Sequence, residues 1–369
     1  MERPVFQPIG TLAEELDTPA LVVDLDLMES NIEILHSAFR QTAAKVRPHV
    51  SAHQCPNIAH RQLAAGDTVG GIAVSSVGEA EVFANAGFSD ILVANQVVTR
   101  PKIRRLCALA RDHRITLAVD NPENVTVLSE LAQRAGVTLH ILVEVDAGLG
   151  RCGVAPGSAA LELARKAQSF RGLQFDGLMA YEGSILNVAR SELESETRRR
   201  LQPVLDTREL LERESVAVSV VSVGGTHNYD IVSKLSGVTE VQAGSYPLMD
   251  YNYCQFRTEF ASAARILSTV IGHPIEARAV VDAGHKATGP DLGVPVLDGF
   301  PGGTATRFSA EHGIMELSGA AVSQLNPQDK AWLVPFNLAL CINQYDYIRV
   351  VRRGKLEGLW PISARGRFG

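Results

Sequence analysis

The sequence predicts an α/β protein in which a (β/α)8 barrel is followed by a smaller, mostly β domain. Over the first two thirds of the 369 residues, eight short apolar and β-branched runs alternate with amphipathic stretches. Most of these runs are almost continuously apolar, which is typical of parallel strands buried on both faces. After about Tyr251, turns rich in glycine and proline separate the strand-like runs. A doubly wound open sheet is the alternative architecture.

The first strand-like run is Ala20–Leu25, and it leads into a stretch with apolar residues at helical spacing. The eight expected barrel strands follow in the order Lys45–Val50, Gly71–Ser75, Ile91–Asn95, Thr116–Asp120, Leu139–Asp146, Phe175–Tyr181, Ser219–Gly224 and Glu240–Gly244. Helical segments such as Gly78–Ala86 and Asn124–Ala135 connect them, and the last third contains the strand-like runs Val280–Ala283, Trp332–Val334 and Tyr347–Arg352. We therefore expect an N-terminal segment over residues 1–20 that packs with the β domain, a barrel over 21–252 and the β domain over 253–369.

Composition and charge exclude several classes of function. Hydrophobic residues make up 46% of the chain, and 35 Lys and Arg against 41 Asp and Glu give a net charge of −6. Without a long basic run, we expect neither a nucleic acid nor a membrane as partner, but a small-molecule substrate. The five scattered cysteines favour reduced thiols, and residues 1–19 lack the apolar stretch of a signal peptide. We expect a cytoplasmic protein.

Two glycine-containing tripeptides end the seventh and eighth expected strands. They are Gly224-Gly225-Thr226 and Gly244-Ser245-Tyr246. Barrel enzymes place their chemistry at the C-terminal ends of the strands and often hold phosphate after strands 7 and 8. Glycines let backbone N–H groups approach an anion, and hydroxyls add donors. An ordinary glycine turn explains either tripeptide alone, but the pair predicts an anion site.

The first barrel strand ends in a polar stretch, Arg47-Pro-His49-Val-Ser51-Ala-His53-Gln-Cys55. If the segment stays extended, His49, Ser51 and His53 share one face and line the barrel mouth. The alternative is a pair of histidines satisfied by backbone partners. The spacing is not by itself a zinc signature.

Two further strand ends carry candidate site residues. Arg151 follows a glycine turn after Glu144-Val-Asp146 and can face a phenolate or carboxylate, unless it only pairs with Asp146. Tyr181 is either a wall for an aromatic ligand or part of the core. Candidate proton-transfer groups at the mouth are His49, His53, His227 and Glu182.

These motifs, in this order, resemble the D-threonine aldolase / D-serine dehydratase family, pyridoxal-phosphate enzymes with an alanine-racemase-type barrel and β domain (fold type III). The resemblance extends from Asp17-Thr-Pro-Ala-Leu-Val-Val-Asp24 to Trp360-Pro-Ile-Ser-Ala-Arg365-Gly. It implies a homodimer in which the β domain of one subunit closes the barrel mouth of the other. It also implies that Arg151 lies near the cofactor phenolate oxygen and Tyr181 near its ring, while the phosphate is held by Gly224, Gly225, Thr226, Gly244, Ser245 and Tyr246.

The chain departs from this family at the residues that carry its chemistry. The family typically has Arg-Pro-His-x-Lys-x-His-Lys on the first strand, and its first Lys forms the Schiff base. Here the two Lys positions are Ser51 and Gln54, and serine cannot form an imine. The family's divalent-metal pair falls on Asn337 and Ala339, which are poor ligands, although Cys341 would share a strand face with them.

We therefore expect a lyase or isomerase of this family that acts on a small amino-acid-like or phosphorylated substrate without a covalent lysine–pyridoxal-phosphate aldimine. Pyridoxal phosphate would bind only non-covalently, and no divalent metal is expected. The alternative is a non-catalytic pseudoenzyme that binds pyridoxal phosphate or another small phosphorylated ligand. A third hypothesis keeps the family activity through a rearranged lysine; Lys286 is not nominated, because some family members have its counterpart.

Overall fold

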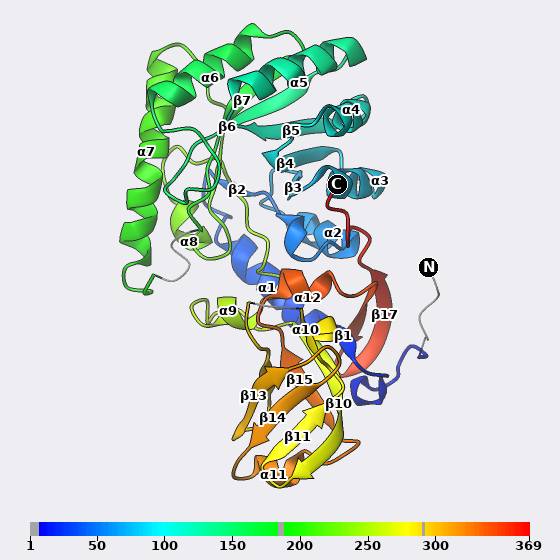
Figure 1. Cartoon of the computed structure of the whole chain (residues 1–369). Helices are drawn as coiled ribbons and strands as arrows, with labels where there is room; N and C mark the ends of the chain where they lie inside the picture. Colours follow the sequence, from blue (N-terminus) through cyan, green and yellow to red (C-terminus); the bar gives the residue numbers. More distant parts are fainter. Residues whose placement is uncertain (1–6, 184–187, 290–291) are drawn as a thin grey trace. The chain divides into compact units, whose positions relative to one another are not determined.

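The computed structural model describes residues 7–183, 188–289 and 292–369, and the chain forms two compact units (Figure 1). The barrel unit comprises Leu35–Ser51, Ala59–Gly244 and Gly366–Gly369. The β unit comprises Met1–Ile34, Ala52–Ile58 and Ser245–Arg365. The chain thus passes between the units several times, whereas the sequence predicted one continuous stretch for each domain.

The barrel unit contains an eight-stranded parallel sheet in the order β2-β9-β8-β7-β6-β5-β4-β3. Parallel bridges from Val46 to Thr68 and from His49 to Ala73 join the two ends of this order, so the sheet closes on itself. This closure confirms the predicted barrel and rules out the open-sheet alternative. The strands are β2 Lys45–Val46, β3 Ile72–Val74, β4 Asp90–Gln96, β5 Arg114–Val119, β6 Leu139–Glu144, β7 Leu173–Met179, β8 Val220–Val223 and β9 Glu240–Val241.

Helices connect the strands, and those from α3 to α7 lie outside the sheet (Figure 1). Helix α5 shows how the sequence sets their limits: Asn121 caps its first turn, Pro122 stands at its start, and Gly136 ends it with a φ of 68°. The helices are α1 Leu25–Ser37, α2 Pro56–Ala64, α3 Val77–Asn85, α4 Arg100–Leu109, α5 Pro122–Ala135, α6 Ser158–Ser169, α7 Leu193–Arg213 and α8 Tyr229–Val232. No helix in the described ranges is both long enough and apolar enough to cross a membrane.

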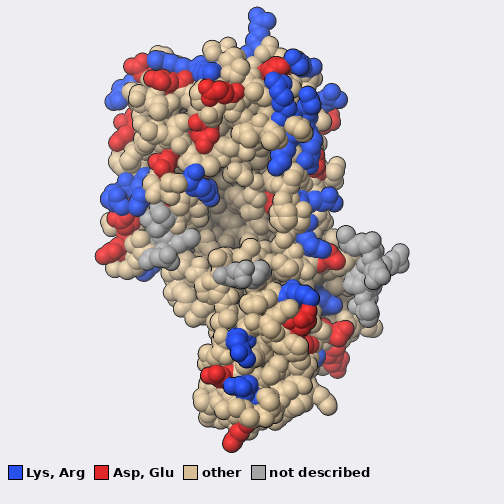
Figure 2. Space-filling view, viewed as in Figure 1, with Lys and Arg blue, Asp and Glu red and all other residues tan. Residues whose placement is uncertain are grey.

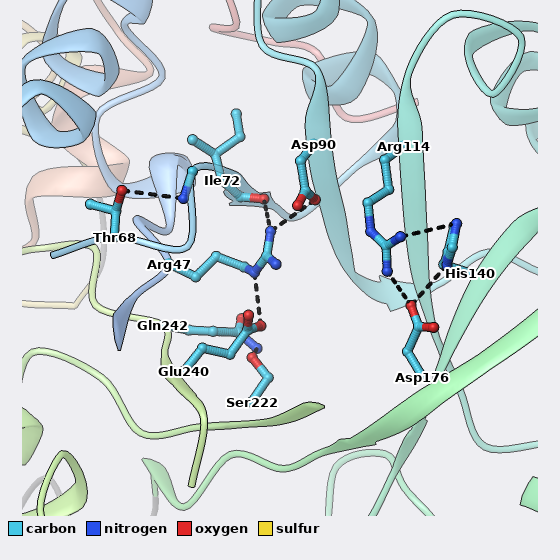
Figure 3. A network of polar contacts seen from close by, with 11 residues as sticks. Arg47, Thr68, Ile72, Asp90, Arg114, His140, Asp176, Ser222, Glu240 and Gln242 are labelled. Carbon is cyan, nitrogen blue, oxygen red and sulfur yellow. Dashed lines mark hydrogen bonds and ion pairs between the residues drawn. The ribbon is translucent and has the colours of Figure 1, made fainter. Parts of the chain in front are cut away.

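Ion pairs occupy the end of the barrel where the strands begin (Figure 3). The buried Arg47 guanidinium donates from Nε to Glu240, at 2.7 Å, and from Nη1 to Asp90, at 3.1 Å. Asp90 and Glu240 are the first residues of β4 and β9. The sequence grouped Arg47 with the polar lining of the mouth, but its side chain is used at the opposite end, where barrels carry stability rather than chemistry.

The β unit is built on a nine-stranded sheet, with β13-β14-β11-β10-β1-β16-β17 in order and β15 pairing with β10 and β12. It includes the strand-like runs expected in the last third. Its strands are β1 Ala20–Asp24, β10 Ala264–Ile275, β11 Arg278–Val281, β12 Val296–Asp298, β13 Gly303–Phe308, β14 Gly313–Leu317, β15 Lys330–Val334, β16 Tyr347–Arg352 and β17 Lys355–Pro361. Among its described residues after β9, the unit has four short α-helices: α9 Tyr251–Cys254, α10 His285–Thr288, α11 Ala321–Gln324 and α12 Leu338–Ile342.

Strand β1 lies inside this sheet, between β10 and β16. The predicted limits placed residues 21–24 in the barrel, but their backbone pairs with the β unit. Ala13 and Leu16, from the segment before β1, pack with Val22 and Leu267 in the core of the same unit. The N-terminal part of the chain therefore supplies a central strand of the β unit.

Candidate active site

The candidate site lies where the strands of the barrel unit end. Figure 2 shows a hollow in the barrel unit, and its visible wall consists mostly of side chains other than Lys, Arg, Asp and Glu. The residues predicted from the sequence come from the ends of β2, β6, β7, β8 and β9, which neighbour one another in the barrel.

The segment after β2 does not stay extended. His49 forms the bridge with Ala73, and its N–H donates to the Ala243 carbonyl at 2.9 Å. The chain then turns through a short 3-10 helix, Val50–Ala52. The predicted common face of His49, Ser51 and His53 requires an extended strand, so this geometry is wrong.

The turn nevertheless brings Ser51 against His49. Ser51 Oγ lies 2.8 Å from His49 Nδ1, and both side chains are partly accessible to solvent. Protein atoms around the ring remove enough water to lower the pKa of His49 to about 4, and the charge of Arg151 contributes to this shift. His49 is therefore a neutral imidazole at pH 7.

His53 lies in the β unit, in the segment Ala52–Ile58. It is buried, and its Nδ1 accepts a hydrogen bond from the Cys55 N–H at 3.2 Å. This contact agrees with the alternative in which the histidine is satisfied by a backbone partner. Its role at the mouth stays a prediction. Gln54, at the second family Lys position, is buried and has a left-handed φ of 54°.

The glycine turn after β6 is held by Asp146. Its carboxylate accepts three successive backbone N–H groups at 2.9 to 3.1 Å, from Gly148, Leu149 and Gly150. The alternative Asp146–Arg151 ion pair is not formed in the described part of the chain. Instead, the Arg151 guanidinium lies 5.6 Å from the centre of the Tyr181 ring, a cation–π distance.

Tyr181, His227 and Glu182 form a second group of neighbouring side chains in the site. The Tyr181 ring meets the His227 ring edge-on, with centroids 5.9 Å apart and an interplanar angle of 85°. Glu182 is fully buried, and its Oε1 lies 3.9 Å from His227 Nε2. Burial raises the pKa of Glu182, although hydrogen bonds from Asn228 and the Gly224 backbone oppose the shift.

Asn228 is the residue of this group that the sequence analysis missed. Its Nδ2 donates to Glu182, and its Oδ1 accepts the Gly225 N–H at 3.1 Å. An Asn that follows a glycine turn resembles any helix-capping residue. Asn228 differs from an ordinary capping residue only in its hydrogen bond to the buried Glu182 side chain. Because the two residues are 46 positions apart, the local sequence does not reveal this bond.

Both predicted phosphate loops need their glycines for reasons within the fold. Gly224 has a φ of 74°, and a Cβ on Gly244 would lie 2.5 Å from the His49 carbonyl oxygen. The N–H groups of Gly224 and Gly225 already donate to Glu182 and Asn228. A phosphate here would share these donors with protein acceptors.

The remaining loop residues are placed as follows. Thr226 is buried beside Gly225, and Tyr246 is buried in the β unit, whose last segment starts at Ser245. Their contact with a phosphate stays a prediction.

The family's metal positions lie on a helix, not on the strand face that the sequence predicted. Asn337 caps α12, and its side chain accepts the Leu340 N–H at 3.1 Å. Ala339 and Cys341 lie within α12, and burial raises the pKa of the Cys341 thiol. Among the residues with described positions, no three His, Cys, Asp or Glu side chains form a cluster able to hold a metal ion.

No lysine occupies a strand-end loop of the barrel unit. Lys45 pairs with Asp67 at the beginning of β2, Lys102 and Lys166 lie in α4 and α6, and the exposed Lys234 follows α8. In the described barrel unit, no lysine therefore stands in a loop that follows the C-terminal end of β2, β6 or β7.

Comparisons with known proteins cover almost the whole chain. The alanine racemase N-terminal domain matches residues 23–251, and a putative serine dehydratase domain matches residues 263–351. The chain is 37% identical to D-threonine aldolase of Arthrobacter sp, over 98% of this chain and 96% of that protein. It is 35% identical to 3-hydroxy-D-aspartate aldolase of Paracoccus denitrificans (strain Pd 1222), over 97% and 94%.

Solved structures agree. D-threonine aldolase from Filomicrobium marinum superposes with a TM-score of 0.94 at 33% identity, covering 98% of this chain and 99% of that one. Alanine racemase of Clostridium difficile 630, at 14% identity and a TM-score of 0.74, shares the fold.

Proposed function

The chain belongs to the D-threonine aldolase / D-serine dehydratase family, and on that basis we propose that it is a divergent lyase that works without a covalent lysine–cofactor bond. The observation that supports the proposal is the contact between the Ser51 hydroxyl and His49, because the resemblance aligns Ser51 with the family's Schiff-base lysine. Similar proteins are named 3-hydroxy-D-aspartate aldolase and D-threo-3-hydroxyaspartate dehydratase. The proposed substrate is a small amino-acid-like or phosphorylated compound that undergoes C–C, C–O or C–N cleavage.

Pyridoxal phosphate, when bound, supplies an electron sink for a substrate carbanion. In this chain, we expect Gly224, Gly225 and Thr226 to hold its phosphate, with Arg151 and Tyr181 beside its ring. The phosphate would share the Gly224 and Gly225 N–H groups with Glu182 and Asn228, and the guanidinium over Tyr181 supplies positive charge. Because serine replaces the lysine, binding would be non-covalent.

The protein's own groups would then move the protons. His49 is neutral at pH 7 and can accept a proton, which the 2.8 Å hydrogen bond allows Ser51 to deliver. Burial raises the pKa of Glu182, and the Glu182–Asn228 hydrogen bond fixes the carboxyl next to His227. We assign Glu182 and His227 to proton donation on the Tyr181 side of the site.

A second candidate function is a pseudoenzyme that binds pyridoxal phosphate or another small phosphorylated ligand without turnover. The observation in its favour is the low pKa of His49, about 4, because such an imidazole is a weak base at pH 7. The lyase and the pseudoenzyme would use the same fold and the same loops, so a measurement of turnover is needed to distinguish them.

The test mixes the purified protein with pyridoxal phosphate and records the absorbance spectrum of the mixture. The mixture is then reduced with borohydride, and the mass of the protein is measured by mass spectrometry. We expect bound yellow cofactor that gel filtration removes, with no gain in mass after reduction. A covalent adduct on the wild-type protein would overturn the proposal. Aldehyde release from 3-hydroxy-D-amino acids supports the lyase, and binding without release supports the pseudoenzyme.

Ser51→Lys tests the alignment on which the proposal depends. We expect it to restore an imine absorbance band and a covalent adduct, because the new amine would stand at the family position. Ser75→Lys is the matched control: Ser75 is also half-buried and follows a barrel strand, β3, but should give no adduct. If Ser51→Lys leaves both the spectrum and the reduced mass unchanged, the assignment of position 51 is wrong.

A further inference from the structure

Ser51 and His49 form a hydroxyl–imidazole pair at the end of the first barrel strand. Ser51 Oγ and His49 Nδ1 are 2.8 Å apart, and neither side chain is fully buried. A serine within hydrogen-bond reach of a neutral imidazole is the arrangement that activates a hydroxyl as a nucleophile. This pair requires no bound cofactor.

The barrel holds His49 in place from both sides. Its N–H donates to the carbonyl of Ala243, two residues after β9, and its backbone bridges to Ala73 of β3. Gly244 packs so closely that a Cβ there would lie 2.5 Å from the His49 carbonyl oxygen. The short Val50–Ala52 turn then directs Ser51 back onto the ring. Rigid supporting elements are what keep a catalytic pair within productive geometry.

The electrostatic surroundings keep the imidazole neutral, so it is free to accept the Ser51 proton, and they make it a weaker base than an ordinary histidine. Ala73, Ala243 and Gly244, which pack against His49 from β3 and β9, carry no charge. Among the described residues, the charge that bears on the His49 ring is that of Arg151. The guanidinium disfavours an imidazolium and favours negative charge on a neighbouring oxygen.

We propose that Ser51 and His49 act as a nucleophile and base that hydrolyse small carboxylic esters. Ser51 Oγ attacks the ester carbonyl carbon, and its proton passes to His49. The bond to the alcohol oxygen breaks, and His49 returns the proton to the leaving alkoxide. Water then attacks the acyl–Ser51 ester, with His49 as base again, and releases the acid and free Ser51. Overall, an ester and one water give an acid and an alcohol.

The experiment uses the full-length protein without added cofactor, p-nitrophenyl acetate as the substrate and a fluorophosphonate as the covalent probe. We expect p-nitrophenolate release and a single phosphonylated peptide containing Ser51. Ser51→Ala should abolish labelling, and His49→Gln should slow both reactions about a hundredfold. Ser75→Ala is the matched control and should change neither, because the Ser75 hydroxyl donates to Glu79 rather than to an imidazole.

The pH profile separates this pair from adventitious surface reactivity. The labelling rate should fall only as the pH approaches the His49 pKa of about 4, whereas an ordinary histidine base would lose activity near 6.5. Arg151→Gln should move the midpoint upward. Labelling that survives Ser51→Ala, or a wild-type midpoint near 6.5, overturns the proposal. Failure of cofactor binding leaves it untouched, since no cofactor is present.

Discussion

Asn228 shows how one side chain can satisfy two buried groups. Its amide donates to the Glu182 carboxylate and accepts the Gly225 N–H. Glu182 and Asn228 are both fully buried, so neither group can turn to bulk water instead. The Gly-Gly loop is therefore tied to the end of β7 through this residue.

We predict that Asn228→Ala lowers the free energy of unfolding by about 2–4 kcal/mol, because it leaves a buried carboxyl group and an N–H without this partner. Urea unfolding measures the change. The control is Asn95→Ala, which removes an exposed amide–carbonyl bond to Ser75 and should cost less than about 0.5 kcal/mol. Equal effects of the two substitutions would contradict this role for Asn228.

At the residue scale, the sequence supplied the identity of Ser51 but not its geometry. That Ser51 stands at the family's lysine position stays a prediction, which Ser51→Lys tests. The 3-10 turn that places Ser51 on His49 was missed, since a polar stretch after a strand is compatible with either an extended or a turned backbone. Asn228 was missed because its partner is distant in the sequence.

At the scale of elements, the barrel strands were predictable because burial on both faces leaves continuous apolar runs. Helix α12 was not. Its five residues are too few for helical periodicity to show. It is instead fixed by two caps: Asn337 accepts the Leu340 N–H, and Asp250, 88 residues earlier, accepts the Leu338 N–H at 2.9 Å. Asp250 also caps α9.

The buried Asp250 carboxyl leads to a prediction about how the free energy of unfolding depends on pH. Burial raises its pKa from 3.8 to about 6, so between these values the unfolded chain has lost a proton that the folded chain keeps. The free energy of unfolding should therefore fall by about 3 kcal/mol as the pH rises from about 4 to 6.

Urea unfolding at a series of pH values measures this slope. Asp250→Asn should flatten it, whereas Asp346→Asn, which changes an exposed ion pair with Arg365, should leave it unchanged. The prediction fails if the wild-type and Asp250→Asn slopes coincide.

At the scale of the whole molecule, the order of barrel and β domain was predictable, but the limits were not. Strand β1 has the same apolar pattern as a barrel strand, and only its partners assign it to the β unit. Those partners lie about 240 and 330 residues away in the sequence. The local sequence of β1 does not predict pairing over such separations.

We predict that a fragment of residues 21–252, the barrel domain as drawn from the sequence, does not unfold cooperatively. It contains β1 without β10 and β16, and it lacks residues 366–369, which belong to the barrel unit. Circular dichroism during urea unfolding, with the full chain as reference, tests this. A fragment with a sharp transition would show that the barrel tolerates an unpaired β1.

The position of β1 also constrains how the protein is made. Residues 20–24 leave the ribosome before either neighbouring strand has been translated, and the parallel partner at 349–351 follows about 330 residues later. The whole barrel can form in the meantime, while a short apolar strand with two open edges remains exposed to other nascent chains. Until β10 and β16 have been made, the unpaired edges of β1 are open to intermolecular strand pairing.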